Sequence, residues 1–218
     1  MIPDWEAERH RMVETQLRAH GIRDPRVLAA MLEIPREDFV PFEMRVLAYR
    51  DDPVPIGYGQ TISQPYMTAI MAEVLELTGA ESVLEVGAGC GYAAAVLGAL
   101  AARVMAVEIV APLVKMARAN LGRSGRSGNV SVVDGDGSMG LLSGAPYDAI
   151  SVAAGAPDVP QTLIDQLSDG GRLVIPVGDR LDQQLRLITK RGTRVESRVV
   201  TQCRFVPLRG DQGWQRGH

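Results

Sequence analysis

The chain has 218 residues and a formal net charge of −3 at pH 7, a size that suits one large domain with an appendage. Hydrophobic residues make up 46% and charged residues 22% of the sequence, the balance of an ordinary globular protein. No apolar run approaches the ~20 residues of a membrane span, and the acidic charge gives no basic surface for nucleic acid. No Cys-x-x-Cys motif or histidine cluster indicates a metal site. We therefore expect no membrane, nucleic-acid or metal partner.

Compartment and assembly follow from a few further features. The first residues are acidic and lack the basic and apolar parts of a secretory signal, so we expect a cytoplasmic protein. The two cysteines, Cys90 and Cys203, are expected to stay reduced, because Cys90 lies within a glycine-rich turn. We expect a monomer, since no helix shows an unpaired apolar face.

The first quarter of the chain predicts a helical appendage. Apolar residues recur at helical spacing from about residue 8 to residue 46, with Gly21 as a break. Four prolines between residues 35 and 55 then lead into a polar, glycine-rich segment at residues 57–67, which is typical of a loop that carries function. We accordingly divide the chain into an appendage at 1–56, an active-site loop at 57–67, a core at 68–210 and a tail at 211–218.

From residue 66 onward, apolar runs alternate with helical stretches, and two strands close the chain as a hairpin. The expected helices lie at 66–77, 92–100, 112–121 and 160–167, and the expected strands at 82–86, 104–107, 130–133, 149–152, 172–177, 184–189 and 195–205. This alternation predicts an α/β fold with a doubly wound, mainly parallel sheet, helices on both of its faces and a C-terminal antiparallel hairpin. In such sheets, ligands bind at the carboxyl ends of the strands.

The most informative motif is the segment at residues 83–92, VLEVGAGCGY. A buried strand that ends in glycines at alternate positions brings backbone close to a ligand. The dinucleotide fingerprint needs glycines at positions 1, 3 and 6, but here they stand at 1, 3 and 5, so NAD is disfavoured. Glu108 follows 17 residues after Gly91, at the end of the next strand, where a carboxylate can accept hydrogen bonds from ribose hydroxyls. A purely structural strand-to-helix turn is the alternative.

Several segments together resemble a known family. The spacing of Glu85 and the glycines resembles motif I of S-adenosylmethionine-dependent methyltransferases, and the segment PIGYGQTISQPYM at residues 55–67 resembles a more specific signature loop. Further similar segments stand at residues 16–22, 34–40, 133–137, 146–150, 166–178 and 204–208. Over about residues 10–210 the chain resembles the protein-L-isoaspartate(D-aspartate) O-methyltransferase family of bacterial type. The resemblance implies a Rossmann-like S-adenosylmethionine-dependent methyltransferase fold.

The resemblance also implies roles for individual residues. Ser63 is the implied catalytic residue, whose hydroxyl binds the substrate carboxylate beside the methyl group. The implied cofactor-binding residues are Gln60, Thr61, Ile62, Ser63, Tyr66, Glu85, Gly87, Gly89, Gly91, Glu108, Ile109, Asp136 and Gly137. The implied substrate-binding residues are Ile62, Ser63, Val206, Pro207 and Leu208. The implied cofactor is S-adenosyl-L-methionine, with S-adenosyl-L-homocysteine as its product.

The side chains in this set have distinct expected contacts. Glu108 is assigned to the ribose hydroxyls and Asp136 to the adenine amino group. Glu85 either orients the glycine turn or reaches the cofactor ammonium through water. From the residues alone, Ser63 is interpreted first as a serine that caps a turn, and the resemblance reverses this. For Tyr66, a place on a packed helix face is the alternative to a contact with the cofactor.

Two positions depart from the family pattern. Cys90 stands where the family often has serine or another small residue, and Ile109 follows Glu108 where arginine is common. Neither departure removes a charge that the cofactor needs. Cys90 is interpreted as a small residue in a tight turn, with oxidation sensitivity as the alternative.

The family implies methyl transfer to the free α-carboxyl group of L-isoaspartyl residues in damaged proteins and peptides, which initiates repair through a succinimide. Isoaspartyl-containing proteins and peptides are then the partners. One alternative keeps the fold but esterifies a side-chain carboxyl in one dedicated peptide to give an aspartimide, and such relatives are expected to carry an additional C-terminal region. A non-catalytic cofactor-binding protein would be favoured had Ser63 or Asp136 been replaced, and neither is.

Overall fold

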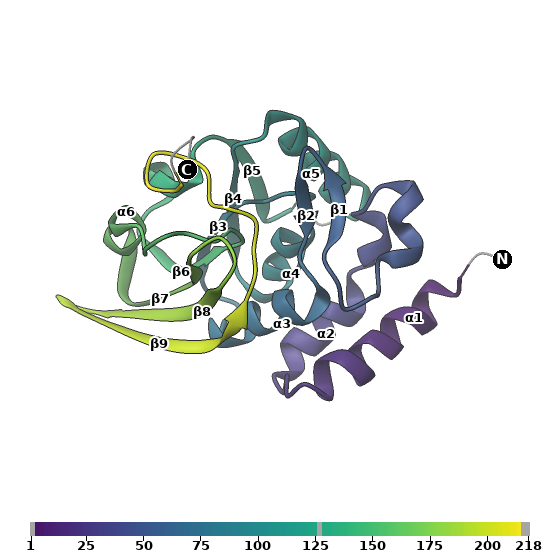
Figure 1. Ribbon diagram of the computed structural model, residues 1–218. Helices are drawn as coiled ribbons and strands as arrows, with labels where there is room; N and C mark the ends of the chain where they lie inside the picture. Colours follow the sequence, from purple (N-terminus) through teal and green to yellow (C-terminus); the bar gives the residue numbers. More distant parts are fainter. Residues whose placement is uncertain (1–2, 126–127, 215–218) are drawn as a thin grey trace.

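A seven-stranded sheet forms the centre of the computed structural model, which describes residues 3–125 and 128–214. In spatial order, its strands are β5 (Val130–Asp134), β4 (Arg103–Glu108), β3 (Ser82–Val86), β6 (Tyr147–Val152), β7 (Leu167–Gly178), β8 (Gln183–Arg191) and β9 (Arg194–Cys203). The pairs from β5 to β7 are parallel, and β8 and β9 are antiparallel to their neighbours. In Figure 1, β8 and β9 extend as a long hairpin away from the N-terminal helices. The mainly parallel sheet with a terminal antiparallel hairpin is confirmed.

Helices cover both faces of this sheet. They are α3 (Pro65–Val74), α4 (Tyr92–Leu100), α5 (Ala111–Arg123) and α6 (Gln161–Asp165), with two 3₁₀ turns, η4 (Gly137–Met139) and η5 (Leu142–Gly144). Val83 packs in one core with Ala94 of α4 and Leu113 of α5, whereas Leu84 packs in a second core with Leu163 of α6. Because successive side chains of a strand point to opposite faces, α4 and α5 lie on one face of the sheet and α6 on the other.

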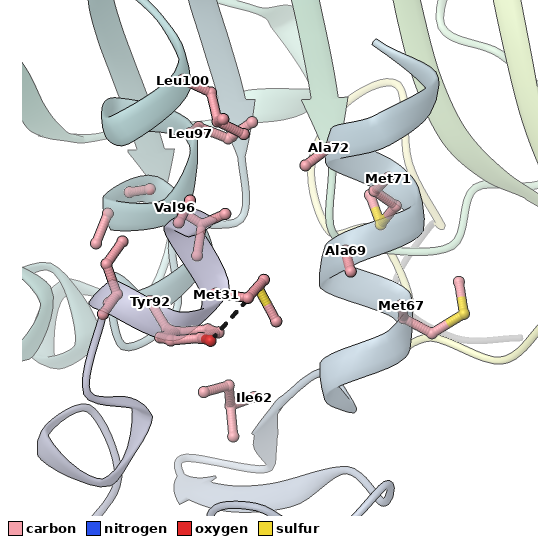
Figure 2. Close-up of a cluster of buried hydrophobic side chains, with 14 of the residues drawn as sticks. Met31, Ile62, Met67, Ala69, Met71, Ala72, Tyr92, Val96, Leu97 and Leu100 are labelled. Atoms are coloured by element: carbon pink, nitrogen blue, oxygen red, sulfur yellow. Dashed lines mark hydrogen bonds between the residues drawn. The ribbon is translucent and has the colours of Figure 1, made fainter. Parts of the chain in front are cut away.

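The N-terminal appendage is helical, as the sequence predicts, and it packs into the core of α3 and α4. It consists of α1 (Trp5–Met12), the π-helical segment η1 (Val13–Arg18), α2 (Pro25–Glu33) and the 3₁₀ turns η2 (Arg36–Asp38) and η3 (Phe42–Leu47). Asp4 and Asp24 cap α1 and α2 by accepting hydrogen bonds from backbone amides at 3.1 and 2.8 Å. Figure 2 shows Met31 of α2 beside Tyr92, whose hydroxyl donates to the methionine sulfur at 3.6 Å. None of the described helices is long and apolar enough to cross a membrane.

The segment at residues 57–67, predicted as a loop, is largely regular structure. β1 (Val54–Gly57) and β2 (Gln60–Ile62) form a two-stranded antiparallel hairpin, and α3 begins at Pro65. Tyr58 has a φ of 55° between two glycines that also have positive φ, which closes the tight turn. Ile56 is buried, so the hairpin has an apolar side. The loop prediction was wrong because strands of three or four residues show no clear alternation in sequence.

β7 also differs from its prediction. The sequence predicts a turn at 169–171 before a strand at 172–177, but β7 already starts at Leu167. Tyr147 pairs with Leu167, and the register shifts before Ala149 pairs with Arg172. Gly170 has a φ of 79°, so the glycines form an irregularity within the strand rather than a turn before it. The helix predicted at 160–167 is shorter, and the ends of the other predicted core helices and strands shift by at most three residues.

The order of strands places a ligand site beside β3. This strand pairs with β4 on one side and with β6 on the other, so the direction of winding reverses here. Crevices at the carboxyl ends of such strands are where α/β sheets bind ligands. The glycine turn follows β3, Glu108 ends β4, and Ala153 follows β6. Residues that lie far apart in the sequence therefore meet at one edge of the sheet.

A buried arginine joins the appendage to this edge. Arg36, in η2, is fully buried, its Nε donates to the Ala48 carbonyl at 2.7 Å, and a terminal nitrogen donates to the Ser63 carbonyl. The guanidinium also lies over the ring of Tyr92, 4.9 Å from its centre. No carboxylate pairs with Arg36 among the described residues, and its burial lowers its pKa. Two carbonyl dipoles and an aromatic face therefore hold this charge.

Replacement of Arg36 is expected to destabilise the whole fold. Arg36→Ala leaves two carbonyl groups without their donors and opens a cavity, so we expect a loss of about 3 kcal/mol or more in the free energy of unfolding. Arg36→Lys should recover only part of this, because an ammonium cannot reproduce the planar donors. Urea denaturation measures both, with the exposed Arg198→Ala as a control expected within about 0.5 kcal/mol of wild type. Equal stability of Arg36→Ala and the control would contradict this role.

Candidate active site

A cleft opens at the carboxyl edge of β3, β4 and β6, where the sheet topology predicts a ligand. It contains about 780 Å³ of space free of atoms, part of which is open to solvent. The sequence-predicted residues that line it are Gln60, Thr61, Ile62, Ser63, Glu85, Gly87, Gly89, Glu108, Ile109, Gly137, Val206, Pro207 and Leu208. The fold thus brings most of the predicted site together around one space.

The glycine turn after β3 has a backbone that side chains would strain. Gly87 and Gly89 line the cleft with φ values of 90° and 54°, a region that residues with a Cβ seldom adopt. Gly91 has a φ of 89° but does not line the cleft. A Cβ there would stand 3.2 Å from the backbone of Ala117, so Gly91 allows α4 to pack against α5.

Glu108, at the end of β4, has a carboxylate that the backbone holds in place. Its Oε2 accepts a hydrogen bond from the Gly89 amide at 2.8 Å, and its Oε1 accepts one from the Val110 amide at 2.8 Å. The side chain is buried by the protein and lines the cleft. Each oxygen of an ionised carboxylate can accept two hydrogen bonds, so both retain capacity for a pair of hydroxyl donors.

Glu85, in β3, has a carboxyl group that lacks hydrogen-bond partners among the described residues of the cleft. It is 1% exposed, and neither of its carboxyl oxygens has a hydrogen-bond partner among the described residues. Burial, followed by the negative charge of Glu108, raises the pKa of Glu85 well above its ordinary value. A buried carboxyl group without a partner costs free energy until a ligand satisfies it. The cleft therefore favours a ligand with a cationic group.

Ser63 lies at the edge of the cleft, directly after β2. Its carbonyl accepts the hydrogen bond from Arg36, whereas its hydroxyl makes no hydrogen bond to a described residue. The side chain is half-buried, so the hydroxyl is free to meet a ligand. No histidine lines the cleft within the ranges that the structure describes, so this serine has no general base of the hydrolase kind there.

Two further predicted residues lie outside the lining. The Asp136 carboxylate accepts hydrogen bonds from the amide and the hydroxyl of Ser138 and from the amide of Asp211, at 2.7 to 2.9 Å. It thereby ties the C-terminal segment to the end of β5. Tyr66, at the start of α3, meets His20 edge-on with ring centres 5.6 Å apart. Its position matches the alternative of packing on a helix face.

The segment at residues 205–214, here called the strap, forms one wall of the cleft. The Val206 carbonyl accepts from the Gly155 amide, and the Gly155 carbonyl accepts from the Leu208 amide and the Trp214 indole, all at 2.8 to 2.9 Å. Figure 1 shows this segment returning from β9 across the molecule towards α6. The strap thus places the three predicted substrate-binding residues of the C-terminal segment over the end of β6.

Some lining residues have no clear signal in the sequence. They include Thr68, Cys90, Tyr92, Ala154 and Arg209. Ala154 lines the cleft because β6 lies beside β3, which periodicity does not reveal. Burial raises the pKa of the Cys90 thiol to about 11, so this thiol is protonated and poorly reactive at neutral pH. Neither Cys90 nor Cys203 forms a disulfide.

The similarity to one family extends over nearly the whole chain. Residues 7–213 match the family model of protein-L-isoaspartate(D-aspartate) O-methyltransferase. This chain belongs to that family. The protein-L-isoaspartate O-methyltransferase 1 of Rhodopseudomonas palustris is 55% identical over 96% of this chain and 86% of its own length. The protein-L-isoaspartate O-methyltransferase of Methanoculleus marisnigri is 54% identical over 95% of this chain and 94% of its own length.

Solved structures of protein-L-isoaspartate O-methyltransferases share the fold. One is similar with a TM-score of 0.83 and 32% identity over 94% of this chain and 67% of that chain. A homologue from Plasmodium falciparum, solved in complex with S-adenosyl-L-homocysteine, is similar with a TM-score of 0.78 and 25% identity over 95% of this chain and 99% of that chain. The protein is therefore an S-adenosylmethionine-dependent methyltransferase of this family.

The residues of the cleft fit this cofactor. S-adenosylmethionine carries an ammonium and a sulfonium group, and Glu85 presents a buried carboxyl group without a partner. The fixed oxygens of Glu108 suit adjacent hydroxyl groups. Gly87 and Gly89 leave backbone open to close approach.

Binding of S-adenosylhomocysteine is expected to strengthen as the pH rises. The raised pKa keeps Glu85 protonated in the free protein at pH values where an ordinary carboxyl group is ionised, and a ligand ammonium favours the ionised form. Affinity should therefore increase as the pH rises through this pKa. Glutamine cannot ionise, so the Glu85→Gln variant should bind S-adenosylhomocysteine about tenfold more weakly than wild type at the highest pH, and its affinity should not change with pH.

Calorimetric titration with S-adenosylhomocysteine from about pH 5 to about pH 8 measures the effect. Glu196→Gln, on β9 and outside the lining of the cleft, serves as the matched control and should keep the wild-type slope. The same slope in wild type and Glu85→Gln would remove Glu85 from the cofactor site.

Proposed function

We propose that this enzyme transfers a methyl group from S-adenosylmethionine to the free α-carboxyl group of L-isoaspartyl residues in damaged proteins and peptides. The observation that carries the proposal is the position of Ser63, whose unengaged hydroxyl stands at the edge of the cofactor cleft on a backbone held by Arg36. The activity for which the relatives are named, protein-L-isoaspartate O-methyltransferase, supports it. Isoaspartyl-containing proteins and peptides are then the partners of the enzyme.

The reaction needs alignment more than acid–base catalysis. A free α-carboxyl group has a pKa of about 3.5, so it is already an ionised nucleophile at neutral pH. Bound S-adenosylmethionine supplies a methyl group on a positively charged sulfur, which leaves as a neutral thioether when the new C–O bond forms. The protein gains rate by holding the carboxylate in line with that methyl group, and well-oriented reactions gain about 7 to 11 kcal/mol in this way.

The residues of the cleft divide this work. Ser63 donates a hydrogen bond to the reacting carboxylate and fixes its direction. Glu108 receives the ribose hydroxyls, and Asp136 acts on the adenine side with a carboxylate oriented by Ser138 and the strap. The remaining proposed cofactor contacts come from Gln60, Thr61, Ile62, Glu85, Gly87, Gly89, Ile109 and Gly137. Val206, Pro207 and Leu208 in the strap lie along the substrate backbone.

The methyl ester then initiates repair without further help from the enzyme. The amide nitrogen of the following residue attacks the ester carbonyl carbon, a five-membered succinimide forms, and methanol leaves. Water reopens the ring at either carbonyl, so part of the product is a normal aspartyl residue. Repeated cycles of methylation and opening convert the remaining isoaspartyl residues.

Ser63→Ala is expected to lower turnover while largely sparing affinity for the cofactor. The hydroxyl is assigned to the reacting carboxylate, and loss of one positioning contact costs on the order of 10- to 1,000-fold in rate. Single-turnover methylation of an isoaspartyl peptide measures the rate, and calorimetry with S-adenosylhomocysteine measures the affinity. Ser197→Ala, which removes an exposed hydroxyl on β9 outside the lining, is a matched control for the rate of methyl transfer. A wild-type rate in Ser63→Ala would exclude the assigned role.

The enzyme is expected to methylate an L-isoaspartyl peptide and to ignore the L-aspartyl peptide of identical sequence. The two differ in which carboxyl group carries the chain, so a site shaped for one misplaces the other by about 1 Å or more, which costs about 100-fold or more. Transfer of labelled methyl groups to the two peptides measures this ratio. Equal labelling, or labelling of neither while a dedicated partner peptide is modified, would favour the alternative of a tailoring enzyme that makes an aspartimide.

A further inference from the structure

A second cleft lies against the cofactor cleft and shares a wall with it. It contains about 310 Å³ of space, and Thr61, Ser63, Ala153 and Val206 line both spaces. Ser63 therefore lies in the wall that separates the cofactor cleft from the second cleft. If the proposed function holds, the cofactor occupies the side of the first cleft beside Gly87, Gly89 and Glu108, and a peptide whose carboxylate reaches Ser63 can extend into the second cleft.

One charged residue lines the second cleft. Arg204 is exposed, and it makes no hydrogen bond or ion pair with any described residue. The other residues that line only this cleft are Pro53, Gln64, Met67 and Phe205, all uncharged. Figure 2 shows Met67 projecting from the side of α3 that faces away from Tyr92 and α4. Among the residues that the structure describes, the walls of the second cleft are therefore uncharged except for Arg204, which has no partner there.

The backbone beside Arg204 is held in place. Phe205 donates its amide to Oε1 of Gln183 at 2.8 Å, and its carbonyl accepts from Nε2 of the same residue at 3.3 Å. Gln183 is 2% exposed, so these hydrogen bonds are shielded from water. The Val206 carbonyl in turn accepts a hydrogen bond from the Gly155 amide at 2.8 Å. A guanidinium on an anchored backbone, with five N–H donors and no partner among the described residues, can donate hydrogen bonds to a carboxylate.

The position of Arg204 decides which carboxylate it meets. The reacting carboxylate must reach the cofactor cleft, which Ser63 and Val206 line and Arg204 does not. Arg204 therefore meets a residue that flanks the isoaspartyl residue in the substrate. We propose that the second cleft is a flanking-residue subsite in which Arg204 selects acidic side chains, so that this enzyme favours isoaspartyl residues in acidic segments.

The test uses isoaspartyl peptides of one sequence that carry Glu, Gln or Lys next to the isoaspartyl residue, in separate series for the preceding and the following position. The kcat/KM for methylation is measured at low ionic strength with wild type and with Arg204→Glu. In at least one series, the wild-type kcat/KM should be highest for the Glu peptide, lower for the Gln peptide and lowest for the Lys peptide. Each difference should be up to about fivefold, which corresponds to the free energy of an exposed ion pair. Arg204→Glu should reverse that order, and added salt should reduce both preferences.

Arg198→Glu is the matched control, because it makes the same change of charge on the exposed face of β9. It lies six residues before Arg204, about 20 Å along an extended chain, and it should keep the wild-type order. Equal kcat/KM for the three peptides in both series, or an order unchanged by Arg204→Glu, would overturn this inference while leaving the proposed function intact. Failure of wild type to methylate any isoaspartyl peptide would overturn the proposed function, and this inference with it.

Discussion

The buried guanidinium of Arg36 is the interaction on which the rest of the site depends. It reaches from the helical appendage to the carbonyls of Ala48 and Ser63 and to the ring of Tyr92, so it links the appendage, the connection between β2 and α3, and the start of α4. Its remaining terminal nitrogen has no partner among the described residues. Moving Ser63 would leave a buried charge with one acceptor fewer, which is costly in a medium of low polarity. The position of Ser63 is thereby coupled to the stability of the core.

The two carboxyl groups of the cofactor cleft differ because their surroundings differ. Glu108 is held by two backbone amides and keeps a fixed direction, whereas Glu85 is buried without a hydrogen-bond partner and has a raised pKa. The protein therefore carries a local electrostatic cost before the cofactor binds. A ligand with a cationic group beside Glu85 would remove that cost.

Much of the fold was predictable because its elements leave periodic traces in the sequence. The apolar run from Val83 and the glycines after it require a buried strand and a turn with positive φ, and Glu108 ends the neighbouring strand as expected. The β1–β2 hairpin was missed because its strands are too short for a pattern, and β7 was placed late because Gly170 sits inside it. At the site, Gly91 and Tyr66 were predicted to bind the cofactor; in the structure they pack against Ala117 and His20, and the sequence pattern does not distinguish the two roles.

The sequence by itself determined the parallel sheet, the glycine turn, the acidic residue at the end of the second parallel strand and the family, because each depends on local periodicity or on the identity of adjacent residues. The tertiary structure alone decided which distant polar groups meet. Arg36 and Ser63 lie 27 residues apart, and Asp136 and Asp211 lie 75 apart, yet each pair shares a hydrogen bond. Contacts of this kind have no period along the chain, since they form only where folding brings two segments together and excludes water from them.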